Sequence, residues 1–233
     1  MNSPLSKVHQ AIAAVKSAIF KASRPRVLPN TPICDLLLHI CNKDEDLALF
    51  VARWIAFPLI RKGTKMDTAL VVIGPNNVGK SLFFEHIVTR LHPEYARATI
   101  RKEELLGRFN GWTAQKNYVV VDDFNPMWQS DSIGNECMVK AYLSSGSFRR
   151  AEKAREPVSQ VNRMNFVFLS FRPAETESTR RFIVINTPEP REEEFYGKLF
   201  ANLSDDDIEG FKHWLMHGLD MRGFNRSSTF IPF

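Results

Sequence analysis

The segment GPNNVGKS, residues 74–81, directly follows the apolar run ALVVI and has the residue types of a phosphate-binding loop. In such a loop, glycines let backbone N–H groups converge on phosphate oxygens at the N-terminus of a helix. The lysine reaches the outer phosphates, and the hydroxyl residue ligates Mg²⁺. A glycine turn that binds nothing is the alternative, but the pattern G-x-x-x-x-G-K-S is complete here. We therefore predict that a nucleotide is held by Gly74, Pro75, Asn76, Asn77, Val78, Gly79, Lys80 and Ser81.

Two adjacent carboxylates, Asp122 and Asp123, follow the apolar run YVVV further along the chain. In P-loop enzymes, a carboxylate at the end of a buried strand completes the Mg²⁺ site. We expect Asp122 to serve the metal together with Ser81, and Asp123 to orient or deprotonate the attacking water. Aspartates in a solvated turn are the alternative, since such turns are common after strands. The position of the pair downstream of a complete loop favours the metal site.

A third polar group, Ser170, ends the apolar run NFVFLS. A polar side chain at the tip of such a strand can sense the γ-phosphate, and this is the role we expect for Ser170. Taken by itself, a serine that ends a strand more often has no such role.

Basic side chains are concentrated in the stretch SFRRAEKAREP, which lies between two of the expected strands. They are Arg149, Arg150, Lys153 and Arg155, and they stand against Glu152 and Glu156. This position predicts a projecting hairpin or loop whose basic side chains follow a nucleic-acid backbone. A solvated surface whose charges compensate one another is the alternative.

The elements that must position these residues are those of an α/β protein. After Thr68, short apolar runs that predict buried strands alternate with helical segments, as in a parallel sheet. The expected strands are Ala69–Ile73, Tyr118–Val121, Asn165–Ser170 and Arg181–Ile185, and the helix after the loop is expected at Ser81–Leu91.

The chain before residue 65 has a different, helical pattern. An apolar stripe of Val8, Ile12, Val15 and Ile19 predicts an amphipathic helix, and two further helices are expected through CDLLLHIC and EDLALFVARWIAF. The C-terminal part returns to helix, where Ser204 and Asp207 have the spacing of a capping box.

Composition agrees with a soluble globular protein. The 233 residues are 44% hydrophobic and 24% charged, and the net charge of +5 mildly favours a polyanionic partner. Three cysteines without a framework spacing predict reduced thiols in a cytosol-like compartment. No signal-peptide pattern opens the sequence, and its most apolar window is too short to span a bilayer. We therefore expect a cytoplasmic protein with no membrane partner.

The order of these motifs resembles that of the superfamily 3 helicases, which are AAA+ ATPases of viruses, phages and plasmids. The likeness is greatest to the helicase part of phage and mobile-element primase-helicases. It includes RWIAFPLIRKGTKMDTALVVIGPNNVGKS, GRFNGW before the strand VVVDD, the block from Lys140 through Lys153 to NFVFLS, and RRF at residues 180–182. It runs from about residue 45 to residue 185.

The resemblance implies a fold and a division of the chain. The fold would be a P-loop AAA+ core, a parallel sheet flanked by helices, with a small helical module before it. Residues 1–65 would form that module and act as an oligomerisation collar, residues 66–188 the ATPase core, and residues 189–233 a C-terminal helical segment packed on the core.

The same resemblance implies an activity. It points to a replicative DNA helicase that hydrolyses ATP with Mg²⁺, as a homo-oligomeric ring of six subunits with ATP at each interface. The ring would translocate 3′ to 5′ on single-stranded or forked DNA, with hairpins lining its channel. Arg181 is expected to be an arginine finger that acts on the neighbouring subunit's ATP, unless it only caps a strand or pairs with an acid such as Glu177. A primase, in the same or a separate chain, is an expected partner.

One position departs from the family pattern. The family usually places Ser-Asn at the tip of the sensor strand, whereas Ser170 is followed here by Phe171. Three functions stay open: a helicase motor, an AAA+ ATPase that loads or remodels a replication protein, and a ring that binds nucleotide and DNA with weak or no hydrolysis. The departure at Phe171 bears on the third.

Overall fold

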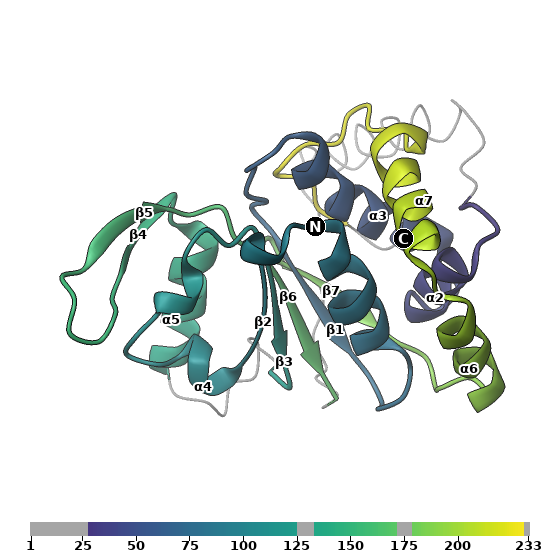
Figure 1. The fold of residues 1–233 in the computed structure, drawn as a ribbon, viewed down its shortest axis with the longest axis horizontal. Coiled ribbons are helices and arrows are strands. Elements are labelled where there is room, and N and C mark those ends of the chain that lie inside the picture. The colour runs from purple at the N-terminus through teal and green to yellow at the C-terminus, as the bar shows by residue number, and fades with distance from the viewer. Residues whose placement is uncertain (1–27, 125–132, 172–178, 231–233) are drawn as a thin grey trace, which may run out of the picture.

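The computed structural model describes residues 28–124, 133–171 and 179–230, and for residues 133–138 and Asn202 it describes the backbone only (Figure 1). The apolar stripe from Val8 to Ile19 lies outside the described residues, as does Glu177.

Five parallel strands form the central sheet, in the order β2-β3-β6-β1-β7. They are β1 (Ala69–Ile73), β2 (Arg97–Arg101), β3 (Tyr118–Asp122), β6 (Asn165–Ser170) and β7 (Phe182–Asn186). Four of them confirm expected strands, although β7 begins one residue later than expected. The central strands are almost continuously apolar and buried because helices cover both faces of the sheet.

The sequence did not predict β2. Ile100 is its only buried side chain, and arginines stand at both of its ends. The strand pairs with β3 alone and so forms one edge of the sheet. An edge strand that is half solvated carries no apolar run, which is why the pattern missed it.

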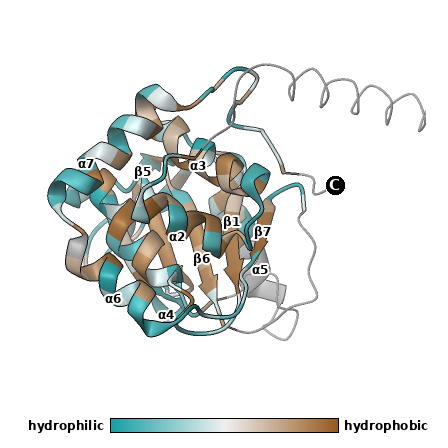
Figure 2. Cartoon of the chain, turned by 90° about the vertical axis from the view of Figure 1, so that its right-hand side faces the viewer, coloured by the Kyte–Doolittle hydropathy of each residue, from teal (hydrophilic) through white to brown (hydrophobic). Residues whose placement is uncertain are grey.

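One face of the sheet is covered by helices from both ends of the described chain. They are α2 (Pro32–Ile40), α3 (Glu45–Ile60), α6 (Glu193–Asn202), α7 (Asp205–His213) and the helical segment after the nucleotide loop (Leu82–Ile87, wound as a π-helix, then the 3-10 turn Val88–Leu91). Their buried residues form one cluster with the strand residues of that face, among them Leu70, Val120 and Leu169. Figure 2 shows apolar residues gathered between these helices and the strands.

Local caps explain where several of these helices begin. The side chains of Thr31 and Asp44 accept backbone N–H groups at the starts of α2 and α3. The expected capping box is confirmed, since Ser204 and Asp207 bond each other reciprocally at the start of α7.

The opposite face carries α4 (Lys102–Leu105) and α5 (Ile133–Ser144). A second cluster buries Val139, Tyr142 and Leu143 of α5 against Phe166 and Phe168. Beyond α5, β4 (Ser147–Arg150) and β5 (Val158–Val161) form an antiparallel hairpin that projects from the body of the molecule (Figure 1). The hairpin expected in the basic stretch is therefore confirmed.

The helices before residue 65 do not have a core of their own among the described residues. Buried residues of α2 and α3 belong to the same cluster as the sheet face and α7. The division at residue 65, and the role of residues 1–65 as a collar, stay predictions. Among the described helices, none is long and apolar enough to cross a lipid bilayer.

Candidate nucleotide-binding site

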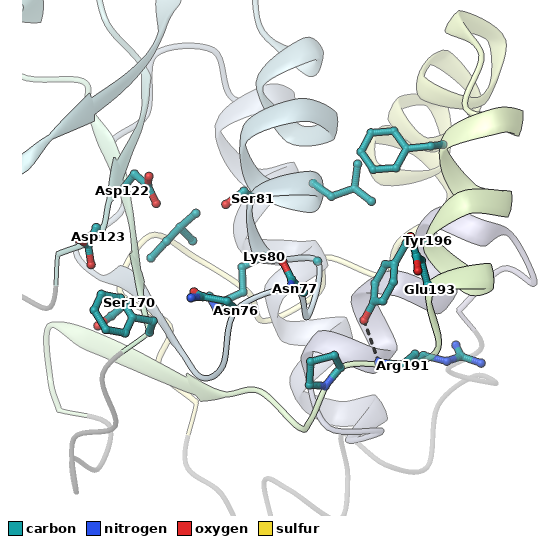
Figure 3. Close-up of a pocket in the computed structure, with 16 residues that line it drawn as sticks. Asn76, Asn77, Lys80, Ser81, Asp122, Asp123, Ser170, Arg191, Glu193 and Tyr196 are labelled. Atoms are coloured by element: carbon teal, nitrogen blue, oxygen red, sulfur yellow. Dashed lines mark hydrogen bonds between the residues drawn. The ribbon is translucent and has the colours of Figure 1, made fainter.

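A cavity of about 1000 Å³ opens where β1, β3 and β6 end (Figure 3). The chain leaves β1 toward β3 and β2 on one side, whereas it leaves β6 across β1 to reach β7 on the other. Connections that diverge in this way leave a crevice at the carboxyl ends of the strands, which is where open α/β sheets bind ligands. The cavity is lined from three parts of the chain: the loop of residues 76–82, the strand ends at 122–123 and 169–171, and the segment 190–200.

The loop after β1 requires glycine at two positions. Gly74 has φ +153°, and a Cβ atom there would lie 1.9 Å from Thr187 Oγ1. Gly79 has φ +97°, and a Cβ atom there would lie 2.7 Å from the side chain of Leu36. Both glycines thus allow a left-handed backbone and close packing. The loop therefore packs between Thr187, directly after β7, and Leu36 of α2.

Lys80 is buried at the base of the cavity. Its Nζ donates to the carbonyl of Gly74 at 2.8 Å and to that of Pro75. Burial lowers the pKa of Lys80, whereas the nearby carboxylate of Asp122 acts to raise it. The ammonium group is therefore held by its own loop, beside a carboxylate, in a place from which it can turn toward a phosphate.

Asp122 and Asp123 line the cavity across from the loop (Figure 3). Asp122 is the last residue of β3 and is half-buried, whereas Asp123 is exposed. The backbone of Asp123 is left-handed, with φ +51°. Aspartate and asparagine adopt this conformation more readily than most residues. The turn thereby separates the directions of two adjacent carboxylates.

A third carboxyl group, which sequence reasoning missed, follows the loop in the same helical segment. Glu85 comes four residues, about one helical turn, after Ser81. Burial raises the pKa of Glu85 and the charge of Asp122 raises it further, while the Ser81 hydroxyl lowers it. The signal was present in the i, i+4 spacing from Ser81, but no motif marks it.

The oxygen donors here suit Mg²⁺. A serine hydroxyl and one carboxylate, completed by phosphate oxygens and water, are typical of magnesium sites in nucleotide enzymes. Within the described residues, no group of three or more His, Cys, Asp or Glu side chains could hold a metal on its own. Ser81 and Asp122 therefore fit a cation that arrives with a nucleotide.

Ser170 also reaches the cavity, from the end of β6. It is buried, and its carbonyl accepts the N–H of Gly74 at 3.1 Å. Phe171, at the position where superfamily 3 helicases usually have asparagine, lines the cavity and is 42% exposed. An aromatic ring thus lies where those helicases usually present an amide.

The far wall of the cavity was not foreseen. It is formed by Pro190, Arg191, Glu193, Tyr196 and Phe200, which follow β7 and enter α6. The Tyr196 hydroxyl accepts the backbone N–H of Arg191 at 3.0 Å and lies 3.3 Å from His39 Nε2. No spacing rule links this segment to a loop more than a hundred residues earlier, so no sequence pattern could have indicated it.

Arg181 lies at the opposite end of the sheet. It immediately precedes β7, and its carbonyl accepts the N–H of Ala69 at the start of β1. Strands β1 and β7 are parallel, and the cavity is at their carboxyl ends. Arg181 is therefore not among the residues that surround the cavity of its own chain, and Arg180 is exposed beside it.

The four basic residues of the hairpin have different surroundings. Arg150 is 3.2 Å from a carboxylate oxygen of Glu152 and donates to Gln160, and Arg155 pairs with the same Glu152 at 2.7 Å. Arg149 and Lys153 are exposed. The register places Arg149 opposite Ser159, on the face of the hairpin away from Phe148. Arg150 and Arg155 thus share the one carboxylate of Glu152, whereas Arg149 and Lys153 are exposed outside these ion pairs; contact with a nucleic acid stays a prediction.

Comparison with known proteins bears on the fold. Residues 72–181 match a family model described as a family of unknown function, DUF5906, which covers a little under half of the chain. No curated protein matches the sequence.

Solved structures resemble the chain over most of its length. An apo structure of the NrS-1 C-terminal region has a TM-score of 0.68 and 21% identity, over 82% of this chain and 47% of that one. Two A-form apo structures of the same region give TM-scores of 0.64 and 0.63 at 21% and 22% identity, each over 79% of this chain and 44% of that one. The chain spans about half the length of these structures, and at this identity the likeness establishes the fold alone.

Proposed function

We propose that the chain is an ATP-hydrolysing motor of the superfamily 3 type, acting as a replicative DNA helicase of a phage or mobile element. One observation carries the proposal: Lys80, Ser81, Asp122 and Asp123, drawn from two distant motifs, line a single cavity large enough for a nucleotide. A chance glycine turn would have no reason to face two strand-end carboxylates. The fold shared with the NrS-1 C-terminal region supports the architecture that this function needs.

Each residue of the cavity would have a separate role in phosphoryl transfer. Backbone N–H groups of the loop receive the phosphates, and Lys80 leaves the carbonyls of Gly74 and Pro75 to reach the outer ones. Ser81 and Asp122 would hold Mg²⁺, which when bound neutralises charge that develops on the phosphate oxygens. Asp123, exposed and on a separate turn, accepts a proton from the attacking water or orients it.

The far wall of the cavity would bind the nucleobase. Tyr196 and Phe200 present aromatic rings to the cavity beside Leu82, and such rings hold a nucleobase by stacking. ATP would thus extend from the strand ends, along the loop, to α6.

DNA would be contacted by the hairpin. Its projection beyond α5 makes it suited to a channel formed by several subunits (Figure 1). The exposed cations Arg149 and Lys153 would follow phosphates without reading bases. Asn110 holds the hairpin in place, since its amide accepts the N–H of Ala151 at 2.6 Å and donates to the Arg149 carbonyl at 3.1 Å. A hexameric ring, translocation from 3′ to 5′ and a partner primase belong to the same proposal.

Phe171 favours a second candidate. Without the usual amide at the sensor tip, phosphate sensing rests on Ser170 or on another side chain of the cavity. A nucleotide-binding ring on DNA with weak or no hydrolysis, or a remodelling ATPase that does not unwind, would tolerate this change.

One experiment separates these functions. ATP turnover is measured with and without single-stranded DNA, alongside strand displacement on a forked duplex, for the wild type and Lys80→Ala. The helicase predicts DNA-stimulated turnover with displacement, both abolished in the variant because Lys80 is the only basic residue of the loop 74–81. Turnover without displacement supports remodelling, and tight binding of ATP without turnover supports the ring.

A further inference from the structure

Glu85 has a carboxylate oxygen that the rest of the protein leaves without a partner. Oε1 is buried and accepts no hydrogen bond, one of two such side-chain atoms among the described residues. The Ser81 hydroxyl, four residues earlier, is near enough to lower the pKa of this carboxyl group. A buried carboxylate oxygen without a donor is costly, so its retention calls for an explanation from something that enters the site.

The helix geometry fixes how Glu85 faces its neighbours. Residues four apart on a helix lie on the same face, so Glu85 and Ser81 are neighbours on one face of this segment. The carboxylate of Asp122 is near enough to act on Glu85 electrostatically. Ser81 and Glu85 therefore lie on the side of this segment that senses the charge of Asp122.

A serine that ligates a cation has a particular requirement. Its oxygen must direct a lone pair at the cation, and its proton must point to an acceptor elsewhere. A hydroxyl hydrogen can rotate, so the acceptor decides which way the lone pairs point. Partners that hold ligands in this way are a general feature of metal sites.

We propose that Glu85 is a positioning residue that accepts a hydrogen bond from the Ser81 hydroxyl. This bond would direct a lone pair of the Ser81 oxygen at the cation bound with the nucleotide. The unpartnered Oε1 of Glu85 is the acceptor atom available to that hydroxyl. The inference rests on the proposed nucleotide site, and it adds to that site a carboxylate that the loop pattern does not contain.

The test measures binding of a fluorescent ATP analogue to the full chain, first in EDTA and then with increasing Mg²⁺. Glu85→Gln should raise the half-saturating Mg²⁺ concentration about 10- to 100-fold, the usual cost of losing such a partner. Binding of the analogue in EDTA should remain within about twofold of the wild type, because Glu85 touches no phosphate. Glu94→Gln, at an exposed position shortly after the same helical segment, is the matched control.

Two further variants separate positioning from charge and from folding. Glu85→Asp keeps the charge but withdraws the carboxylate from Ser81, so it too should raise the Mg²⁺ requirement. In a Ser81→Ala background, Glu85→Gln should have little additional effect, because the two residues act as one unit. A variant that only destabilised the fold would lower the unfolding temperature and weaken EDTA binding as well.

The outcomes are distinct. Unchanged Mg²⁺ half-saturation in Glu85→Gln, in a protein whose wild type binds the analogue in a Mg²⁺-dependent manner, overturns the positioning role and leaves the nucleotide site intact. An equal effect with and without Ser81 overturns it too, since Glu85 would then act on the cation directly. A wild type that binds no analogue at all contradicts the proposed function itself.

Discussion

Lys80 shows what a single residue must do in this site. Its ammonium group already bonds the carbonyls of Gly74 and Pro75, and it is buried beside Asp122. An incoming phosphate would compete with two carbonyl oxygens, and its advantage would be its full negative charge, which a carbonyl oxygen lacks. The loop's own carbonyl groups thus fix the position of the lysine, from which the proposed function needs only a short movement toward a phosphate.

Asp123→Asn should keep nucleotide binding and lose hydrolysis. Asparagine fits the left-handed backbone at φ +51° as well as aspartate does, so the turn should not change. The amide cannot take a proton, and turnover should fall about 10²- to 10⁴-fold. Single-turnover hydrolysis and analogue binding are measured in parallel. Wild-type turnover in Asp123→Asn would remove Asp123 from the catalytic role.

The hairpin is the element whose contribution the structure refines most. Of its four basic residues, Arg149 and Lys153 face solvent and lie outside the Glu152 ion pairs. The double variant Arg149→Ala/Lys153→Ala should therefore weaken single-strand binding similarly for every sequence. It should reduce the slope of log K against log salt by about 0.7 for each phosphate that is no longer neutralised. Affinity for ATP should hardly change.

The control for the hairpin removes the same charge elsewhere. Lys198→Ala/Lys212→Ala takes two cations from α6 and α7, where they pair with Glu194 and Glu209. DNA binding that falls equally in both double variants would reflect net charge and contradict a hairpin contact. Arg150→Ala should instead loosen the hairpin, because Arg150 bonds Glu152 and Gln160.

Lys65 couples two elements and predicts a pH dependence of stability. It lies just before β1, and its Nζ donates to the carbonyl of Leu143 in α5. Burial lowers the pKa of Lys65 to about 8, while Asp67 acts to raise it. An unfolded lysine has a pKa of about 10.4, so between about pH 8 and about pH 10 the unfolded chain binds more protons. The free energy of unfolding should therefore rise with pH across this window.

Urea unfolding of the wild type and Lys65→Met over that pH range measures this effect. The wild type should gain stability relative to the variant as pH rises, because methionine has no proton to lose. Parallel curves for the two proteins would show that burial does not disfavour the charged form of Lys65.

The sequence predicted those helices and strands whose pattern lies within a few consecutive residues. The strands β1, β3, β6 and β7, the helices α2 and α3, the hairpin and the α7 capping box all follow from runs or spacings of a few residues. β2 was missed because an edge strand has little apolar periodicity, and Glu85 because a positioning residue has no motif. The wall formed by Tyr196 and Phe200 depends on how the chain returns after β7, which no local pattern encodes.

For the whole molecule, the separation of Arg181 from the cavity is the informative feature. The residue lies at the amino ends of the strands, whereas the nucleotide would bind at their carboxyl ends. An arginine in this position cannot reach the γ-phosphate of an ATP bound to its own chain, because the length of the sheet separates the two. If it acts in hydrolysis, it acts on a neighbouring subunit, and the ring becomes part of the active site.

Mixing two inactive variants tests this arrangement. Arg181→Ala alone should bind ATP but hydrolyse it about 10³- to 10⁵-fold more slowly, the usual worth of an arginine finger. Lys80→Ala alone should be inactive. Rings that contain both will have interfaces where an intact Lys80 faces an intact Arg181, and these should hydrolyse ATP. Native mass spectrometry must show that mixed rings form. If they form and no activity returns, Arg181 does not act across the interface, and its place beside Ala69 at the start of β1 is then structural.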